Sequence, residues 1–232
     1  SYVNSLSSAM QAYLTLGSEK HLRAAQNGFD MLSRQSFVTG GWGPNETLGS
    51  DLAASLTGTH NSFETPCGSY AHFKLTRYLL RVTRDARYGD SMERVMYNTV
   101  LGAKPLQPDG RHFYYSDYNF KGHKFYKDAT WACCSGTLPQ VAADYRINTY
   151  FRDSEGVYVN LYIPSALRST AISLTQKGAY PFDGLMQFDV TASKGTEYAL
   201  RFRIPEWADG ASVSVNGRRV DAPVIPGSFA SV

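Results

Sequence analysis

The stretch GVYVNLYIP at residues 156–164 marks the point where the sequence changes from a helical to a strand-like pattern. Apolar residues alternate over 157–163, as they do along a half-buried β-strand. Turn pairs such as Asp183-Gly184 and Asn216-Gly217 separate the short apolar segments that follow. These segments lie at 172–174, 186–190, 198–204 and 212–215. Short strands with such turns predict an antiparallel β-sandwich.

Before residue 152 the pattern is mainly helical. Residues 18–34 place Leu22 and Phe29 on one apolar stripe, which predicts an amphipathic helix. Further helices are expected over 73–82, 86–101 and 139–150, the last with Pro139 in its first turn. The segment 39–61 has no clear period, and a loop of that length is usually functional. We therefore expect a helical domain at 1–152 and a β-sandwich domain, incomplete here, at 153–232.

The composition of the chain excludes several classes of protein. Its 232 residues carry a formal net charge of +3, too small to indicate a nucleic-acid partner. No apolar run reaches the roughly 18 residues that predict a membrane-spanning helix. The N-terminus lacks the charged region and compact apolar core of a signal peptide, so the cellular location stays open. The 16 tyrosines suit a sugar-binding cleft, although most tyrosines serve packing.

The cysteines are the most informative residues for function. Cys67, Cys133 and Cys134 form a poor disulfide framework, because their number is odd and two are adjacent. They could be buried, inert thiols. However, Glu64 lies three residues before Cys67, so a helix would place both on one face. A carboxylate and three thiolates are ligands that zinc prefers.

A thiolate is also a nucleophile, and nucleophilic catalysis needs a proton donor for the leaving group. Glu46 is the best candidate for that donor, because it follows the glycine-rich segment TGGWG at residues 39–43. Glycines let the backbone approach a ligand closely. The alternative interpretation is an ordinary exposed glutamate on a loop.

Several motifs recur in a fixed order along the chain. They are TGGWG at 39–43 with Glu46, ETPCGSY at 64–70, YGD at 88–90, ER at 93–94, YN at 97–98, WACC at 131–134, GVYVNLYIP at 156–164, RFRIPEW at 201–207 and VNG at 215–217. Taken together they resemble glycoside hydrolase family 127, the beta-L-arabinofuranosidase family. The resemblance spans almost the whole chain. One departure is that Thr65 and Pro66 separate Glu64 from Cys67, where the family's best-known pattern has a single residue.

The resemblance implies a fold, mainly α with β. Members of the family fold as an (α/α)6 barrel followed by β-sandwich domains and are considerably longer than this chain. The resemblance therefore implies a partial chain that contains the later barrel helices and the start of an antiparallel β-sandwich.

The resemblance also implies a function, a retaining glycoside hydrolase that releases L-arabinofuranose or a related sugar from glycans. By position, Cys133 is the implied nucleophile and Glu46 the acid/base residue. Zn²⁺ is the implied cofactor, and Tyr115 corresponds to a sugar-contacting tyrosine. The implied zinc ligands are Glu64, Cys67, Cys133 and Cys134.

Two other functions remain open at this point. One is a carbohydrate-binding protein in which the zinc is purely structural, because closed tetrahedral coordination would use all three thiols. The other is a helical-toroid lyase or isomerase acting on uronic acids, with His60, His72 and Arg77 around the substrate carboxylate. The sequence does not indicate an oligomeric state.

Overall fold

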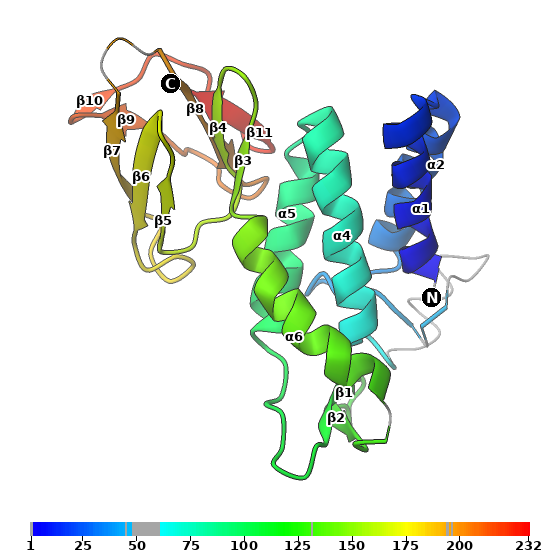
Figure 1. Ribbon diagram of the computed structural model, residues 1–232. Coiled ribbons are helices and arrows are strands. Elements are labelled where there is room, and N and C mark those ends of the chain that lie inside the picture. Colours follow the sequence, from blue (N-terminus) through cyan, green and yellow to red (C-terminus); the bar gives the residue numbers. More distant parts are fainter. Residues whose placement is uncertain (1, 45, 48–60, 131, 194, 196) are drawn as a thin grey trace. The chain divides into compact units, whose positions relative to one another are not determined.

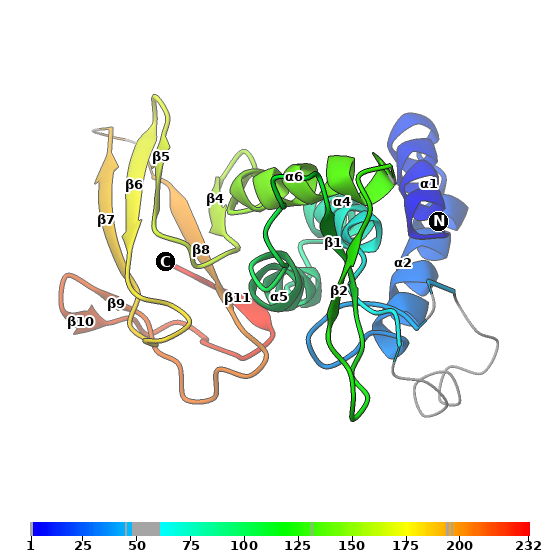
Figure 2. The same ribbon diagram turned by 90° about the horizontal axis from the view of Figure 1, so that it is seen from below.

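The computed structural model describes residues 2–44, 46–47, 61–130, 132–193, 195 and 197–232. The chain divides into two compact units, residues 1–145 and 146–232. Each unit is described separately below (Figures 1 and 2). Among the described residues, no helix combines the length and apolar character needed to cross a membrane.

The first unit is mainly helical. Its elements are α1 (Tyr2–Leu16), α2 (Glu19–Arg34), α4 (Pro66–Thr83), α5 (Arg87–Arg94), the π-helix η1 (Val95–Val100), β1 (His112–Ser116), β2 (Lys124–Lys127) and α6 (Ala132–Ile147), the last of which ends just inside the second unit. Helix α4 contacts α1, α2, α5 and η1, so it forms the centre of the packing. Its buried residues Leu75 and Leu79 meet a core that includes Leu32 and Met92.

The predicted helices are present, with different boundaries. Helix α2 agrees with the predicted 18–34, whereas α4 begins at Pro66, seven residues before the expected start at Phe73. Helix α1 was not predicted. The prediction for 139–150 was wrong at both ends: α6 covers Ala132–Ile147 with Pro139 inside it, and Tyr150 starts a strand. The early start of α6 places the adjacent cysteines in its first turn.

Strands β1 and β2 form an antiparallel hairpin in the first unit. The pairing is Phe113 with Tyr126 and then Tyr115 with Phe125, so the register shifts at Tyr114. Such a β-bulge inserts one extra residue into a strand and changes the direction of its side chain.

The second unit contains small sheets. Its strands are β3 (Tyr150–Arg152), β4 (Gly156–Val159), β5 (Ser165–Arg168), β6 (Ile172–Lys177), β7 (Gln187–Ala192), β8 (Ala199–Ile204), β9 (Ser214–Val215), β10 (Arg218–Arg219) and β11 (Ser228–Ser231). A four-stranded sheet has the order β11-β8-β4-β3, and a three-stranded sheet the order β5-β6-β7. Phe188 of β7 packs on Phe202 of β8 with ring centroids 4.8 Å apart, so side chains of the two sheets share a core.

Two sequence predictions for this unit were wrong in detail. The strand expected over 157–163 ends at Val159, and the sheets are not purely antiparallel because β4 and β8 pair in parallel. Parallel neighbours need a long crossover connection, and the segment that contains β5, β6 and β7 provides it. The turn signals indicated local hairpins but could not reveal a pairing between distant strands.

Candidate active site

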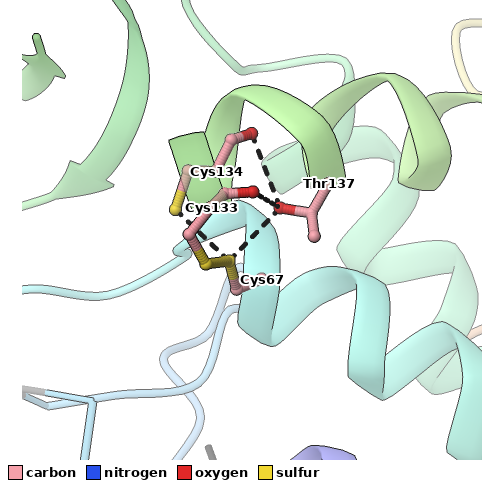
Figure 3. The surroundings of a disulfide bond; sticks show 4 residues. All are labelled: Cys67, Cys133, Cys134 and Thr137. Atoms are coloured by element: carbon pink, nitrogen blue, oxygen red, sulfur yellow. Dashed lines mark hydrogen bonds between the residues drawn. A yellow bond between two sulfur atoms is a disulfide. The ribbon is translucent and has the colours of Figure 1, made fainter. Parts of the chain in front are cut away.

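Two helix N-termini bring the three cysteines together (Figure 3). Cys67 is the second residue of α4, which starts at Pro66. Proline suits that position because its missing N–H would have no helical partner there. Cys133 and Cys134 are the second and third residues of α6. The partial positive charge of a helix N-terminus favours thiolates, so both helices contribute to the same electrostatic effect.

The three sulfur atoms form a compact group. All lie within 4.8 Å of one another, and the Cys67 and Cys134 sulfurs are 3.5 Å apart. Thr137 lies beside them, with its hydroxyl oxygen 3.3 Å from the Cys67 sulfur (Figure 3). In the structure Cys67 and Cys133 are joined as a disulfide. The cysteine count argued against a disulfide framework, but it could not foresee that α4 and α6 place two non-adjacent cysteines side by side.

The cysteines differ in their access to solvent. Cys133 is exposed, Cys67 is half-buried and Cys134 is buried. Burial, the largest cause, and the Glu46 carboxylate together raise the pKa of the Cys134 thiol to about 11, against the opposing effect of a hydrogen bond with the Cys67 backbone. The exposed Cys133 is therefore the sulfur that a substrate could reach.

The sulfur group fits a zinc ion once the cysteines are reduced. Zinc binds thiolate at about 2.3 Å, so thiolates around one tetrahedral ion lie about 3.8 Å apart. The spacing of the three sulfurs, all within 4.8 Å, is compatible with that value. A bound cation would also remove the proton from the buried Cys134 thiol. Glu64, the fourth predicted ligand, is not part of the group.

Glu64 instead occupies a buried polar site. It is fully buried, and its carboxylate accepts hydrogen bonds from Thr39 at 2.5 Å, from Ser116 at 2.7 Å and from the Tyr118 hydroxyl. The ammonium group of Lys124 lies 3.5 Å away. The expectation that Glu64 and Cys67 share one helix face was wrong, because α4 starts at Pro66 and Glu64 precedes it with a positive φ of 69°.

Glu46 lies close to the cysteines. It is exposed, has a positive φ of 57° and acts electrostatically on Cys134. Positive φ is unusual for a residue with a side chain and is often found at functional sites. The Glu46 carboxylate is hydrogen-bonded to Tyr114. Residues 48–60, most of the loop predicted to be functional, lie outside the described residues.

Tyr115, the predicted sugar-binding residue, lies in the hairpin next to this group. Its ring packs against Phe125 with centroids 4.6 Å apart. Sequence reasoning missed its neighbour Tyr114, which is the tyrosine that reaches Glu46. It also missed the three hydroxyl donors around Glu64. Strand alternation shows that Tyr114 and Tyr115 point in different directions, but not which of them faces the site.

The residues proposed for a lyase are placed differently. His72 is buried, with Nε2 2.6 Å from the Ser91 hydroxyl, and Arg77 pairs with Asp144 at 3.7 Å. His60 lies outside the described residues. These contacts give His72 and Arg77 structural roles and do not join them to the cysteines.

Comparison with known protein families decides the family of the chain. Residues 6–146 match the catalytic domain of the GH127 beta-L-arabinofuranosidases. The chain belongs to glycoside hydrolase family 127. Residues 156–232 of this family 127 chain match the middle domain of the same enzymes. No curated protein sequence is similar enough to count as a match.

Solved structures of family 127 enzymes share the fold of this chain. A GH127 beta-L-arabinofuranosidase from Geobacillus stearothermophilus T6 is 25% identical, with a TM-score of 0.79 over 98% of the chain. A second GH127 beta-arabinofuranosidase is 22% identical, with a TM-score of 0.78 over 99% of the chain. The family 127 chain covers 38% and 39% of these two proteins. It therefore corresponds to well under half of their length.

Proposed function

We propose that the intact protein is a retaining glycoside hydrolase that releases L-arabinofuranose or a related sugar from glycans. The observation that carries the proposal is the exposed Cys133 within a group of three cysteines, with the Glu46 carboxylate nearby, in a chain of family 127. This arrangement combines a nucleophile with a proton donor, the two groups that a retaining glycosidase needs.

In this proposal Cys133 and Glu46 carry out the two halves of the reaction. The Cys133 thiolate attacks the anomeric carbon while Glu46 protonates the glycosidic oxygen, so a C–S bond forms as the C–O bond breaks. Glu46 then removes a proton from water, which displaces the sulfur and releases the sugar with its original configuration. The disulfide form of Cys133 has no free sulfur, so the active protein is the reduced one.

We further propose that Cys67, Cys133, Cys134 and Glu64 would hold a zinc ion. A bound zinc ion would keep the thiols deprotonated at neutral pH. The spacing of the three sulfurs supports the cysteine part of this ligand set. For Glu64, ligation requires its carboxylate to exchange the hydroxyl donors of Thr39, Ser116 and Tyr118 for the metal.

The proposal extends to the architecture. The helices before residue 152 would be the later part of an (α/α)6 barrel, and residues 153–232 the start of a β-sandwich domain. The TM-score of 0.79 with a family 127 enzyme supports this assignment. Tyr115 would line the sugar site from the hairpin.

Hydrolysis of p-nitrophenyl β-L-arabinofuranoside by the reduced, zinc-loaded intact protein tests the function. NMR of the first product should show a retained anomeric configuration. Cys133→Ser should lower turnover by about 1,000-fold or more, because a serine hydroxyl is not ionised at neutral pH. Full activity in this variant would reject the mechanism.

Glu46→Gln separates catalysis from simple binding. The enzyme proposal expects this variant to bind L-arabinose as the wild-type protein does, with turnover of methyl β-L-arabinofuranoside, whose leaving group needs protonation, lowered by about 100-fold or more. If the protein only binds carbohydrate around a structural zinc, the wild-type protein will show sugar binding without any hydrolysis.

Zinc content and thiol titration test the ligand set. The reduced wild-type protein should contain one zinc ion and three thiols protected from modification. Cys134→Ser and Glu64→Gln should each weaken zinc binding in a competition with a chelator, because each removes one ligand. Glu19→Gln, a substitution in the first turn of α2, is the control. Unchanged affinity in Glu64→Gln would remove Glu64 from the ligand set.

A further inference from the structure

The β-bulge in strand β1 gives Tyr114 a position that regular pairing would not provide. Phe113 pairs with Tyr126 and Tyr115 pairs with Phe125, so no residue of β2 lies opposite Tyr114. Bulges are frequent next to active sites, where they redirect a side chain. The bulge therefore places two consecutive tyrosines at the site with different surroundings.

The Tyr114 ring is held from two sides. The Tyr115 ring meets it edge to face, with centroids 5.2 Å apart, and the Lys127 ammonium group lies 5.3 Å from its centroid. Both contacts limit the motion of the ring. The position of the Tyr114 hydroxyl is therefore well defined.

That hydroxyl is hydrogen-bonded to the Glu46 carboxylate. Burial raises the pKa of Tyr114, and the contact with Glu46 raises it further, so the phenol keeps its proton. A carboxyl group, with or without its proton, has an oxygen that accepts hydrogen bonds, so the hydroxyl is the donor. Glu46 itself is exposed in a turn, so fixing its side chain in one orientation costs conformational entropy.

We propose that Tyr114 is a positioning residue, which holds Glu46 in the orientation needed to protonate the glycosidic oxygen. The inference rests on the proposed function. During the first half of the reaction Glu46 passes its proton to the leaving oxygen and becomes an anion, while the Cys133 sulfur bonds to the anomeric carbon. The Tyr114 hydroxyl donates to the carboxylate throughout, so it fixes the geometry of the proton transfer.

Leaving-group dependence separates this role from a purely structural one. A p-nitrophenolate departs without protonation, whereas an alkoxide needs the acid. We expect Tyr114→Phe to lower kcat/KM about 10- to 100-fold for methyl β-L-arabinofuranoside. The same variant should change kcat/KM for p-nitrophenyl β-L-arabinofuranoside by less than about 3-fold, because that step needs little help from Glu46.

The matched control is Tyr126→Phe, which removes a hydroxyl from the same hairpin. The Tyr126 hydroxyl bonds to Pro105 and Gln107, so this variant should leave both rates unchanged. In a Glu46→Gln background, adding Tyr114→Phe should cause no further loss on the methyl glycoside, because the two residues act through one carboxyl group. This second comparison stands even if Tyr114→Phe lowers the yield of folded protein.

Each outcome of the experiment decides one question. Equal losses on the two glycosides, or additive losses with Glu46→Gln, would overturn the positioning role of Tyr114 and leave the proposed function intact. A wild-type protein that cleaves neither glycoside would overturn the proposed function, and the inference with it.

Discussion

His72 shows what burial does to a single side chain in the helical unit. Its imidazole is fully buried on α4, meets the Phe29 ring edge to face and contacts the Ser91 hydroxyl through Nε2. Burial lowers the pKa of His72 to about 4, because the charged form would lose its hydration. The folded protein therefore keeps this histidine neutral.

This shift predicts a loss of stability in acid. The unfolded histidine has a pKa near 6.5 and the folded one a pKa of about 4, so the unfolded state binds more protons between these values. The stability that depends on a neutral His72 is fully present above pH 6.5. As the pH falls toward 4, the free energy of unfolding drops by on the order of 3 kcal/mol. Urea unfolding at several pH values should show a smaller decrease for His72→Gln than for the wild-type protein. Parallel curves for the two proteins would contradict the prediction.

At the residue scale, the sequence shows which side chains have unusual chemistry better than it shows which residues they contact. Cys67, Cys133 and Cys134 stood out because few roles suit three thiols, and the structure brings them together. Tyr114 could not be separated from Tyr115, because a bulge does not follow from the alternation of side chains along a strand. The hydroxyl donors of Glu64 come from distant segments and belong to common residue types, so no local pattern indicated them.

At the scale of elements, the glycine-rich segment before Glu46 packs directly on Glu64, just before α4. A Cβ atom at Gly41 would lie 2.1 Å from Cγ of Glu64, far closer than side-chain atoms approach. Glu64 cannot move away easily, because its backbone N–H bonds to the Trp42 carbonyl and its carboxylate is held by hydroxyl groups. Only glycine fits at position 41.

Gly41→Ala should therefore destabilise the protein by about 1–3 kcal/mol, the usual cost of an added methyl group in a tightly packed place. The free energy of urea unfolding measures the effect. The control is Gly136→Ala in α6, where a Cβ would meet nothing within 4 Å. Since alanine favours helix, this variant should gain about 0.5–1 kcal/mol. Equal stability of the two variants would contradict the packing argument.

How well each element could be predicted depends on the strength of its pattern. Helix α2 has a clear apolar stripe that includes Phe29 and Leu32, and its range was predicted closely. Helix α6 begins with Ala-Cys-Cys-Ser-Gly-Thr, which are mostly weak helix formers. The helix was therefore predicted to start only at Pro139. Tertiary packing overrides such local preferences, and the misplaced start hid the cysteines' position at a helix N-terminus.

At the scale of the whole molecule, the sequence indicated the change from helices to sheets, and the structure confirms it. The change of apolar period near residue 152 was enough for that. The parallel pairing of β4 with β8 could not be predicted, because turn residues indicate pairing only between strands that are neighbours in the sequence. Long-range contacts leave no local trace in the chain.

The disulfide predicts a redox-dependent stability. Cys67 and Cys133 are 66 residues apart, so their bond closes a long loop in the unfolded chain. In the chain-entropy account this constraint is worth about 4 kcal/mol at 25 °C. The metal-free protein should therefore unfold at a higher urea concentration without reductant than with it. Cys67→Ser should abolish the difference, and Cys134→Ser should keep it. Identical transitions in a protein shown by mass to be oxidised would contradict the prediction.

The parallel pair β4 and β8 also has a consequence for the order of events as the chain leaves the ribosome. Residues 156–159 emerge about 40 residues before their partners at 199–202, and the intervening β5, β6 and β7 can pair locally in the meantime. Strand β4 must wait with one edge open until β8 is synthesised. Closing this distant contact should limit the folding rate of the second unit, and the waiting edge is where a stalled nascent chain is most exposed to aggregation.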